Sequence, residues 1–316
     1  MLVFSSVERD DLIAPQVFLI ICAILMLLCF TACTPGGSNG LFPDTVPVTG
    51  AEAPARLADA VAWRICIVDP AGAEVWSFTE AELAEMLEPF AHAYSTVNNW
   101  PTTRFYAAEG YSLADILVAV GLYDAAQTVY FRAADGYQVS FTAEQLFSPQ
   151  YHYPQVGENG GGAEQVFPII AYRWREGTKN LSEVSDNKPC LIIGQRNHLE
   201  HTNPAFVVGV AEILVDYAPC EKWPTATTFP LPGPIAVGET VKLQHPDCGL
   251  VKLHYTLDGS EPTTLSPMYN PSTYQLELNR PIPITEPTVI KVLVRGYGKA
   301  DSEIAVFEFT PVENRR

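Results

Sequence analysis

The sequence predicts an α+β domain over residues 62–217, followed by an all-β sandwich over residues 238–316. In the first region, helix-capping residues alternate with short strand patterns, which is typical of an α+β fold. In the second region, short alternating strands are separated by Gly, Pro, Asp and Asn at intervals typical of a sandwich. Five prolines crowd residues 218–237 between the two regions, which predicts a semi-stiff linker.

A hydrophobic segment, residues 1–33, begins the chain, and its apolar run Val17–Cys33 contains no charged residue. The run ends in Phe30-Thr31-Ala32-Cys33, and small residues before a cysteine resemble a bacterial lipoprotein signal with Cys33 as the lipidated residue. This resemblance implies an extracytoplasmic protein that a lipid anchor holds at the membrane. An uncleaved membrane anchor stays open as an alternative, because the residues before the run are acidic, whereas export signals usually begin positive. Residues 34–61 are expected to be a flexible spacer.

The charge of the chain is strongly acidic, with 19 basic and 36 acidic residues and a net charge of −17. Contacts to nucleic-acid phosphates require clustered Lys and Arg side chains, and the sequence contains no basic stripe. Nucleic acid is therefore excluded as a partner. The acidity fits an exposed surface domain and does not bear on the fold.

The seven cysteines fall into two groups. Cys22, Cys29 and Cys33 lie in the leader, whereas Cys66, Cys190, Cys220 and Cys248 lie in the predicted domains. Because Cys220 and Cys248 flank the predicted linker, a disulfide between them is possible in an oxidising compartment. Cys66 and Cys190 sit in apolar strand patterns and fit buried thiols equally well. No C-x-x-C pair occurs, which argues against a structural zinc site.

Three capping signals predict helices within residues 62–217: Thr79–Glu82, Ser112–Asp115 and Thr142–Gln145. The apolar positions that follow at helical spacing are Leu83, Met86, Leu87 and Phe90 after the first signal, and Leu113, Ile116, Leu117 and Val120 after the second. Gly121 is expected to end the second helix. The third helix is expected to be short.

Strand patterns alternate with these helices, and Asp135-Gly136 predicts a tight hairpin between two of them. The predicted strands are Ala62–Val68, Thr128–Ala133, Tyr137–Phe141, Val166–Tyr172, Cys190–Gly194 and Phe206–Val215.

Five sequence blocks occur in this domain in the order FYAAEGYSLADILVAVGL, VYFRAADGYQVSFTAEQL, FPIIAYRWREG, PCLIIGQR and FVVGVAEILV. Their order and spacing resemble the molybdopterin-binding domain of the sulfite oxidase type. In that family a cysteine thiolate before the GYSL-type helix holds molybdenum, a soft metal centre. The corresponding loop here, His92–Pro101, has no cysteine, and the nearest candidate is the harder hydroxyl of Ser95. We therefore expect no cofactor, with bound molybdopterin as the alternative.

The same resemblance implies a pocket for a small anionic or polar ligand. Asn98, Asn99 and Arg104 are expected near this pocket, with Gln195 and Arg196 on its opposite wall. An arginine there would supply a forked donor to an anion. Each residue taken alone also fits turn capping or surface solvation.

Two other chemistries find little support. His198-Leu199-Glu200-His201 resembles a metal cluster, but it lies in a predicted loop and no third ligand is evident, so exposed polar residues are the preferred interpretation. The pattern G-x-S-x-G occurs at Gly36–Gly40, but this stretch belongs to the predicted flexible spacer, without the strand and helix that flank a nucleophile elbow.

The C-terminal region carries the segment His254–Thr263, HYTLDGSEPT. It resembles the signature of the chitobiase/β-hexosaminidase C-terminal domain, an immunoglobulin-like, FN3-associated sandwich over about residues 238–311. In those enzymes the module is accessory, so the resemblance implies no glycosidase activity. Glycan binding would need an exposed aromatic platform, for which the candidates are Tyr255, Tyr269, Tyr274 and Tyr297.

Three functional hypotheses follow. The preferred one is a lipid-anchored extracytoplasmic binding or interaction protein whose molybdopterin-type domain is non-catalytic. The alternatives are a molybdopterin-dependent oxidoreductase of the sulfite oxidase type and a cell-wall or glycan-binding adhesion module. The expected partners are the membrane, through the lipid anchor, and a small polar ligand, a glycan or a surface protein.

Overall fold

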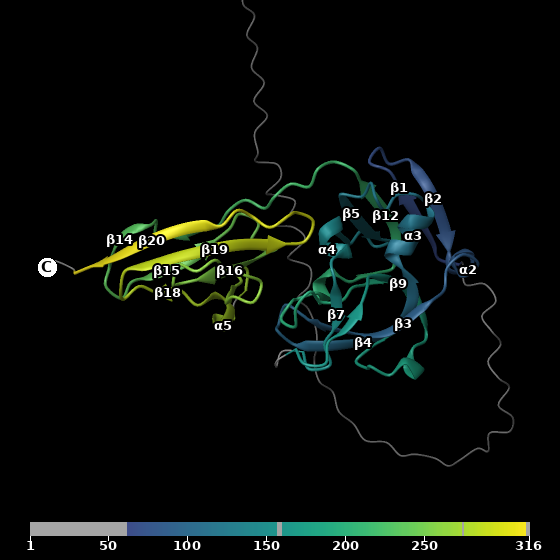
Figure 1. Cartoon of the computed structure of the whole chain (residues 1–316), viewed down its shortest axis with the longest axis horizontal. Coiled ribbons are helices and arrows are strands. Elements are labelled where there is room, and N and C mark those ends of the chain that lie inside the picture. The colour runs from purple at the N-terminus through teal and green to yellow at the C-terminus, as the bar shows by residue number, and fades with distance from the viewer. Residues whose placement is uncertain (1–61, 157–159, 274, 314–316) are drawn as a thin grey trace, which may run out of the picture. The chain divides into compact units, whose positions relative to one another are not determined.

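The computed structural model describes residues 62–156, 160–273 and 275–313 (Figure 1). The predicted leader 1–33, with the predicted lipidation site Cys33, and the predicted spacer 34–61 lie outside the described residues. None of the helices in the described part of the chain has the length and apolar character needed to cross a bilayer.

The first sheet of the N-terminal domain has five strands in the order β2-β1-β12-β5-β6. The strands are β1 (Arg64–Val68), β2 (Glu74–Thr79), β5 (Thr128–Ala133), β6 (Gln138–Thr142) and β12 (Val210–Asp216). Strands β1 and β12 pair in parallel, and the other pairs are antiparallel. The predicted hairpin is confirmed, since Gly136 between β5 and β6 has φ +90°.

The second sheet also has five strands, in the order β11-β10-β9-β4-β3. They are β3 (Phe90–Val97), β4 (Thr103–Ser112), β9 (Ile169–Glu176), β10 (Asp186–Ile192) and β11 (Val207–Val208), and a separate hairpin joins β7 (Gln150–His152) to β8 (Glu164–Val166). At a bulge between β4 and β9, a Cβ added to Gly110 would lie 2.2 Å from the carbonyl oxygen of Ile170. Only glycine allows the two backbones to approach this closely.

All three predicted helix starts are confirmed. The helices are α2 (Glu80–Ala84), α3 (Leu113–Ala119) and α4 (Ala143–Phe147), and the described residues also contain the short helical turns η1 (Leu181–Glu183) and η2 (Asn203–Ala205). Thr79 and Thr142 form capping boxes, and Ser112 accepts a hydrogen bond from the amide of Asp115. The predicted extent of the first helix is wrong, because α2 ends at Ala84 and Phe90 already belongs to β3.

The described residues are mostly β, so the predicted balance of helices and strands in the N-terminal domain was too helical. The largest difference lies at His92–Pro101, predicted as a loop, where residues up to Val97 belong to β3. The buried half of β3 holds Ser95 and Thr96 between Tyr94 and Val97. These small polar residues break the apolar alternation by which a strand is recognised in sequence.

One buried cluster forms the core of this domain. Its largest fully buried side chains include Tyr94, Phe78, Phe131 and Phe141. Burial of each large apolar side chain contributes about 1.5–3 kcal/mol to folding. The core therefore holds the sheets and the short helices in fixed positions, which fixes the loops at their ends.

The C-terminal domain has a separate core between two further sheets, with strand orders β13-β15-β18 and β14-β20-β19-β16-β17. The strands are β13 (Thr227–Phe229), β14 (Gly233–Ala236), β15 (Thr240–Gln244), β16 (Val251–Thr256), β17 (Met268–Tyr269), β18 (Ile282–Pro283), β19 (Thr288–Gly296) and β20 (Ala305–Val312), and the helix is α5 (Leu276–Asn279). Both sheets contribute to this core, with Leu243 from β15 and Leu253 and Phe309 from β16 and β20. This arrangement is the predicted β sandwich.

The predicted linker 218–237 needs correction. It contains β13, which pairs with β15, and β14, which pairs in parallel with β20. Trp223 and Ile235 lie in the core of the sandwich. Proline tolerance at edge strands allows these segments to pair although the stretch is rich in proline. The C-terminal domain therefore begins before residue 238.

The turn after β19 joins the two domains, which belong to one compact unit. The Gln145 amide donates to the carbonyl oxygens of Gly296 (2.9 Å) and Lys299 (2.8 Å) and accepts a hydrogen bond from the amide of Gly298 (3.0 Å). Tyr297 packs against the N-terminal core, with its ring 5.0 Å from that of Phe141. This turn brings β16 and β19 beside loop 195–204 of the N-terminal domain.

Candidate functional site

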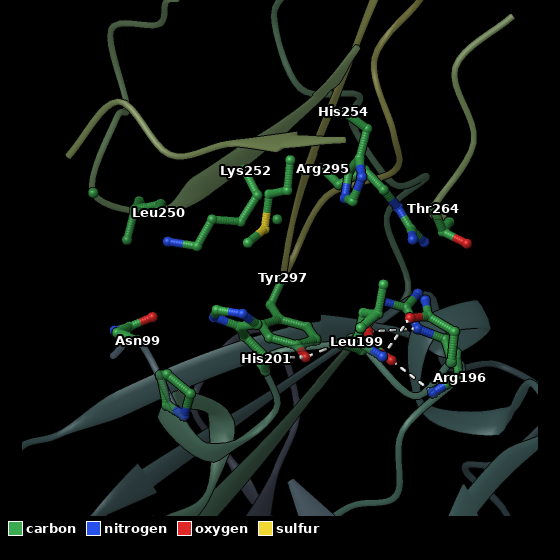
Figure 2. Close-up of a pocket in the computed structure, with 16 residues that line it drawn as sticks. Asn99, Arg196, Leu199, His201, Leu250, Lys252, His254, Thr264, Arg295 and Tyr297 are labelled. Atoms are coloured by element: carbon green, nitrogen blue, oxygen red, sulfur yellow. Dashed lines mark hydrogen bonds and ion pairs between the residues drawn. The ribbon is translucent and has the colours of Figure 1, made fainter. Parts of the chain in front are cut away.

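A pocket of about 140 Å³ lies where loop 195–204 faces β16 and β19 (Figure 2). Its lining residues are Asn99, Arg196, Asn197, Leu199, Glu200, His201, Pro204, Gly249, Leu250, Lys252, His254, Thr264, Met268, Arg295, Gly296 and Tyr297. Both domains contribute residues to this lining, so the pocket forms only when the two domains are packed together.

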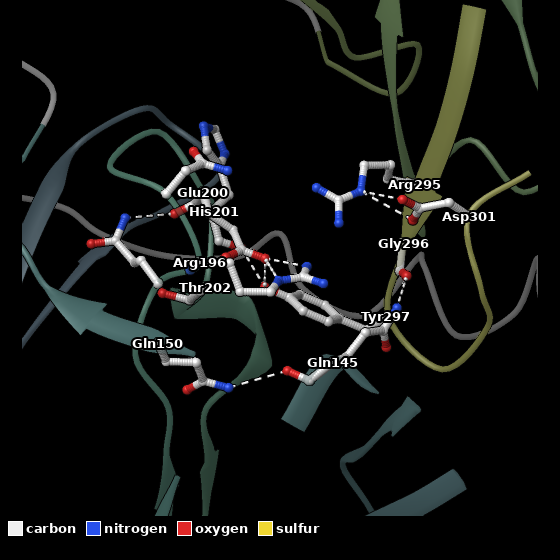
Figure 3. Close-up of polar contacts among 12 residues, drawn as sticks. Gln145, Gln150, Arg196, Glu200, His201, Thr202, Arg295, Gly296, Tyr297 and Asp301 are labelled. Carbon is white, nitrogen blue, oxygen red and sulfur yellow. Dashed lines mark hydrogen bonds and ion pairs between the residues drawn. The ribbon is translucent and has the colours of Figure 1, made fainter. Parts of the chain in front are cut away.

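Loop 195–204 is held in place by the ion pair between Arg196 and Glu200 (Figure 3). The Arg196 Nε lies 2.9 Å from Glu200 Oε1, and the Arg196 amide donates to Glu200 Oε2 at 2.6 Å. Burial disfavours the charged guanidinium, but the Glu200 carboxylate outweighs this effect and keeps the pKa of Arg196 above its ordinary value. The charge of Arg196 is thus already balanced within the loop.

The sandwich side of the pocket presents three basic side chains: Lys252 and His254 from β16 and Arg295 from β19. Arg295 is paired, because its Nε lies 2.9 Å from Asp301 Oδ2. The side chain of Lys252 has no hydrogen bond or ion pair within the described ranges, and burial lowers its pKa. Lys252 is therefore the pocket cation whose charge is not balanced by a carboxylate in contact with it.

Two histidines lie beside this lysine. Burial lowers the pKa of His201 to about 4, and the nearby positive charges of Lys252 and His254 act in the same direction. The buried Nδ1 of His201 has no hydrogen-bond partner in the described part of the chain. The Nδ1 of His254 lies 3.1 Å from the carbonyl oxygen of Ser266. A carbonyl can only accept, so Nδ1 of His254 carries the hydrogen and, in the neutral ring, Nε2 stays free to accept.

The structure brings together some of the five residues predicted for the pocket. Asn99 and Arg196 line it. Gln195 is fully buried and supports the loop, since its Nε2 donates to the carbonyl oxygen of Glu200 at 2.9 Å. Asn98 instead accepts hydrogen bonds from two amides of its own turn, and Arg104 pairs with Glu176 on the neighbouring part of the sheet. Neither Asn98 nor Arg104 is among the residues that line this pocket.

Sequence reasoning missed Lys252, His254 and Arg295. A signal was available for the first two, because Lys252 and His254 alternate with the buried residues Val251 and Leu253. Alternation places both polar side chains on the same face of β16, away from the core. That this face meets loop 195–204 depends on contacts between segments far apart in the sequence, which no local pattern shows.

Ser95 tests whether a molybdenum centre of the resembled type fits this chain. Its side chain is fully buried, its Oγ donates to Gln195 Oε1 at 2.6 Å, and it accepts a hydrogen bond from the amide of Tyr153 at 2.7 Å. Beside it, the hydroxyls of Thr96 and Thr202 lie 2.6 Å apart. The hydroxyl of Ser95 is committed to a buried network, and a soft metal prefers a thiolate. These residues do not fit a thiolate-held molybdenum.

The cysteines of the described residues do not supply the missing ligand. Cys66, Cys190, Cys220 and Cys248 are free thiols, and none of them lines the pocket. Burial raises the pKa of the Cys190 thiol, which keeps it protonated and inert. The Cys220–Cys248 disulfide is thus not formed in the structure, and the pairing stays a prediction.

The side chains of His198, Glu200 and His201 are not gathered as three metal ligands in the described part of the chain. Glu200 is engaged by Arg196, and the ring of His198 lies 6.1 Å from that of Tyr153. Within residues 62–156, 160–273 and 275–313, no group of three or more His, Cys, Asp or Glu side chains is placed to hold a metal ion. His201 contributes to the pocket as a single polar group.

Comparison with known proteins bears on the C-terminal domain. Residues 241–309 match the family model described as Fn3 associated. A search of the curated proteins found no match to the chain. The match covers most of the sandwich and confirms the predicted FN3-associated, immunoglobulin-like character of this domain, whereas the sulfite oxidase-type resemblance of residues 62–217 stays a prediction.

Proposed function

We propose that this protein is an extracytoplasmic binding protein, held at the membrane through a lipid on Cys33, whose pocket receives a small polar ligand. The observation that carries the proposal is the pocket itself, which combines uncommitted polar groups from two domains. Convergent polar side chains in an otherwise apolar concavity are the usual mark of a small-molecule site.

The size of the pocket limits the ligand. Its volume of about 140 Å³ is below the roughly 300–1,000 Å³ of sites for drug-sized molecules. Leu199, Leu250 and Met268 provide apolar contact, while Lys252 and His201 provide polar contact. A ligand of a few non-hydrogen atoms, or one charged group of a larger molecule, fits this description.

The Fn3-associated match supports an accessory role for the sandwich. In this proposal the sandwich has no chemistry of its own and completes the pocket with β16 and β19. The sulfite oxidase-type scaffold is non-catalytic, because the hydroxyl of Ser95 is bound within a buried network where the resembled family has its thiolate.

A pocket-filling substitution tests the proposal. Gly249 lines the pocket, its backbone is not in the left-handed region, and an added Cβ would meet no atom within 4 Å. Gly249→Trp therefore adds a Cβ without a steric clash, and it is chosen to place a bulky ring at the pocket wall. The experiment is a thermal-shift screen of the full-length chain against sugars, amino acids, nucleotides, carboxylates and inorganic anions.

The expected result is a class of compounds that stabilises the wild type but not Gly249→Trp. Leu257→Trp is the matched control, since Leu257 is exposed on the same domain and lies outside the pocket. It should respond like the wild type. Equal responses of wild type and Gly249→Trp to every hit would show that binding occurs elsewhere and would refute this site.

Glycan binding is the second candidate, favoured by the exposure of Trp100. This side chain is 72% exposed and follows the pocket residue Asn99. The tyrosines of the sandwich give no such support: Tyr269 is buried, Tyr255 and Tyr297 pack against the two cores, and Tyr274 lies outside the described residues. A glycan array probed with the full chain and with Trp100→Ala tests this candidate. Binding that is independent of Trp100 would remove it.

A further inference from the structure

We propose that the ligand of this pocket is an anion, bound by Lys252, and that its binding takes up a proton on the neighbouring histidines His201 and His254. The inference rests on the proposed binding function and adds the chemical class of the ligand and its dependence on pH.

The first step is the arrangement of Lys252, His201 and His254 in the pocket. Figure 2 shows the Lys252 side chain and the His201 ring on facing sides of the same space, with His254 and Arg295 further along it. Lys252 and His254 come from β16, and His201 comes from loop 195–204. The two domains therefore contribute these side chains to the lining of one pocket.

The second step is the balance of charge around these groups. Glu200, the nearest acid on the loop, is engaged by Arg196, and Asp301 is engaged by Arg295. Within the part of the chain that the structure describes, no other carboxylate lines the pocket. In a chain with a net charge of −17, the pocket thus keeps one partly buried ammonium group without a counter-ion among the described residues. A partly buried cation is stabilised by an anion, and charge-assisted contacts of this kind are among the stronger polar interactions.

The third step concerns the proton. Burial and the charge of Lys252 keep the pKa of His201 at about 4, and burial likewise lowers the pKa of His254 despite the favourable Ser266 carbonyl. Both rings are therefore neutral in the ligand-free protein near neutral pH. Arg295 further opposes a charge on His254, whereas Asp301 and Glu200 favour it. Tyr297, packed beside Glu200, is uncharged because burial raises its pKa.

An anion placed among these groups reverses the balance. It favours the imidazolium forms, so it raises the pKa of His201 in the complex above about 4. Between the pKa of the free and of the bound protein, binding then takes up a proton, and affinity increases as the pH falls. Each pKa unit of difference corresponds to about a tenfold change in affinity.

The experiment is isothermal titration of the full-length chain with sulfate at pH values from about 5 to about 7.5, where sulfate itself does not titrate. We expect affinity to be about tenfold higher at the acidic end, with proton uptake revealed by a dependence of the heat on the buffer. Parallel titrations with phosphate and with glucuronate distinguish a tetrahedral anion from a carboxylate as the preferred group.

Variants assign the effect to residues. Lys252→Met should weaken sulfate binding by about tenfold or more. His201→Gln combined with His254→Gln should retain binding but lose its dependence on pH. Lys242→Met, at an exposed lysine of β15, and His198→Gln, at a neighbour of His201 outside the pocket, are the matched controls and should behave like the wild type.

Four outcomes would overturn the inference. Sulfate binding that is independent of pH, or a pH dependence that persists in the double histidine variant, removes the coupling to a proton. Stabilisation by neutral compounds alone, abolished by Gly249→Trp, refutes the anion class but leaves the proposed function intact. Failure of every compound class to bind would refute both.

Discussion

At the scale of single residues, the pocket contains charges that are balanced and one that is not. Arg196 is paired with Glu200 and Arg295 with Asp301, and both pairs order the walls. Lys252 has no such partner in the described residues and is available to a ligand. In the proposed site, structural and ligand-binding roles are thus assigned to different cations.

We expect the Arg196–Glu200 ion pair to contribute more to stability than the Arg104–Glu176 ion pair. The side chains of Arg196 and Glu200 are 21% and 10% exposed, so Glu200→Gln leaves a largely buried guanidinium without its counter-ion. We expect this loss to lower the free energy of unfolding by about 3–5 kcal/mol. Urea denaturation of the variant and the wild type measures the difference. Glu176→Gln, which removes the exposed partner of Arg104, should cost no more than about 1 kcal/mol. Equal costs for the two variants would contradict this assignment.

The burial of His152 leads us to expect that the protein loses stability in acid. This histidine is 3% exposed, its buried Nδ1 lacks a hydrogen bond in the described residues, and burial lowers its pKa to about 4. The unfolded chain then binds more protons between pH 6.5 and about 4, so the free energy of unfolding falls by up to about 3 kcal/mol as the pH falls through this range. Denaturation of His152→Phe across this range should show a smaller decrease. An unchanged pH dependence would contradict the interpretation.

At the scale of elements, capping and turn residues predicted those helices and turns that are formed by interactions within a few residues. The starts of α3 and α4 and the β5–β6 hairpin were predictable, because each depends on a cap or a turn within a few residues. Strands β3 and β4 were missed because they contain Ala, Ser, Thr and Gly at buried positions. Their strand conformation comes from pairing with distant segments, which overrides weak propensity.

The candidate site was predictable only in part for the same reason. Asn99 and Arg196 could be proposed from a resemblance along the chain, whereas Lys252 and His254 belong to another domain. A strand pattern shows that two polar residues share a face but not what that face meets.

The side chain of Gln145 links α4 to the turn after β19 through hydrogen bonds. Gln145→Leu removes the contacts to Gly296, Gly298 and Lys299, so the amide hydrogen of Gly298 should exchange with solvent faster. The exposed Gln165, substituted in the same way, is the control and should leave this exchange rate unchanged. Unchanged protection of Gly298 in Gln145→Leu would show that the turn is held by other contacts.

At the scale of the whole molecule, two cores are joined by one turn. Tyr297 packs against the N-terminal core and, with Phe141, joins the sandwich to it. Tyr297→Ala should therefore separate a single calorimetric unfolding transition into two, since each domain keeps its own core. Tyr217→Ala, at an exposed position, should keep the wild-type profile. A single transition in Tyr297→Ala would mean that the domains are coupled elsewhere.

The predicted compartment leads to a covalent test of the whole chain. If the chain is exported to an oxidising environment, peptide mapping without reduction should recover Cys220 linked to Cys248, while Cys66 and Cys190 remain alkylatable after unfolding. Cross-linking of that pair would close a loop and contribute about 2–4 kcal/mol to stability. Recovery of all four as free thiols from the membrane fraction would refute the pairing.

The most direct measurement for the central claim, that the chain is a binding protein with its site between loop 195–204 and strands β16 and β19, is native mass spectrometry of the full-length protein from a host that makes molybdopterin. The account predicts a small acidic adduct on the wild type, its absence from Gly249→Trp, and no molybdopterin mass on either. A molybdopterin adduct that Gly249→Trp retains would contradict it.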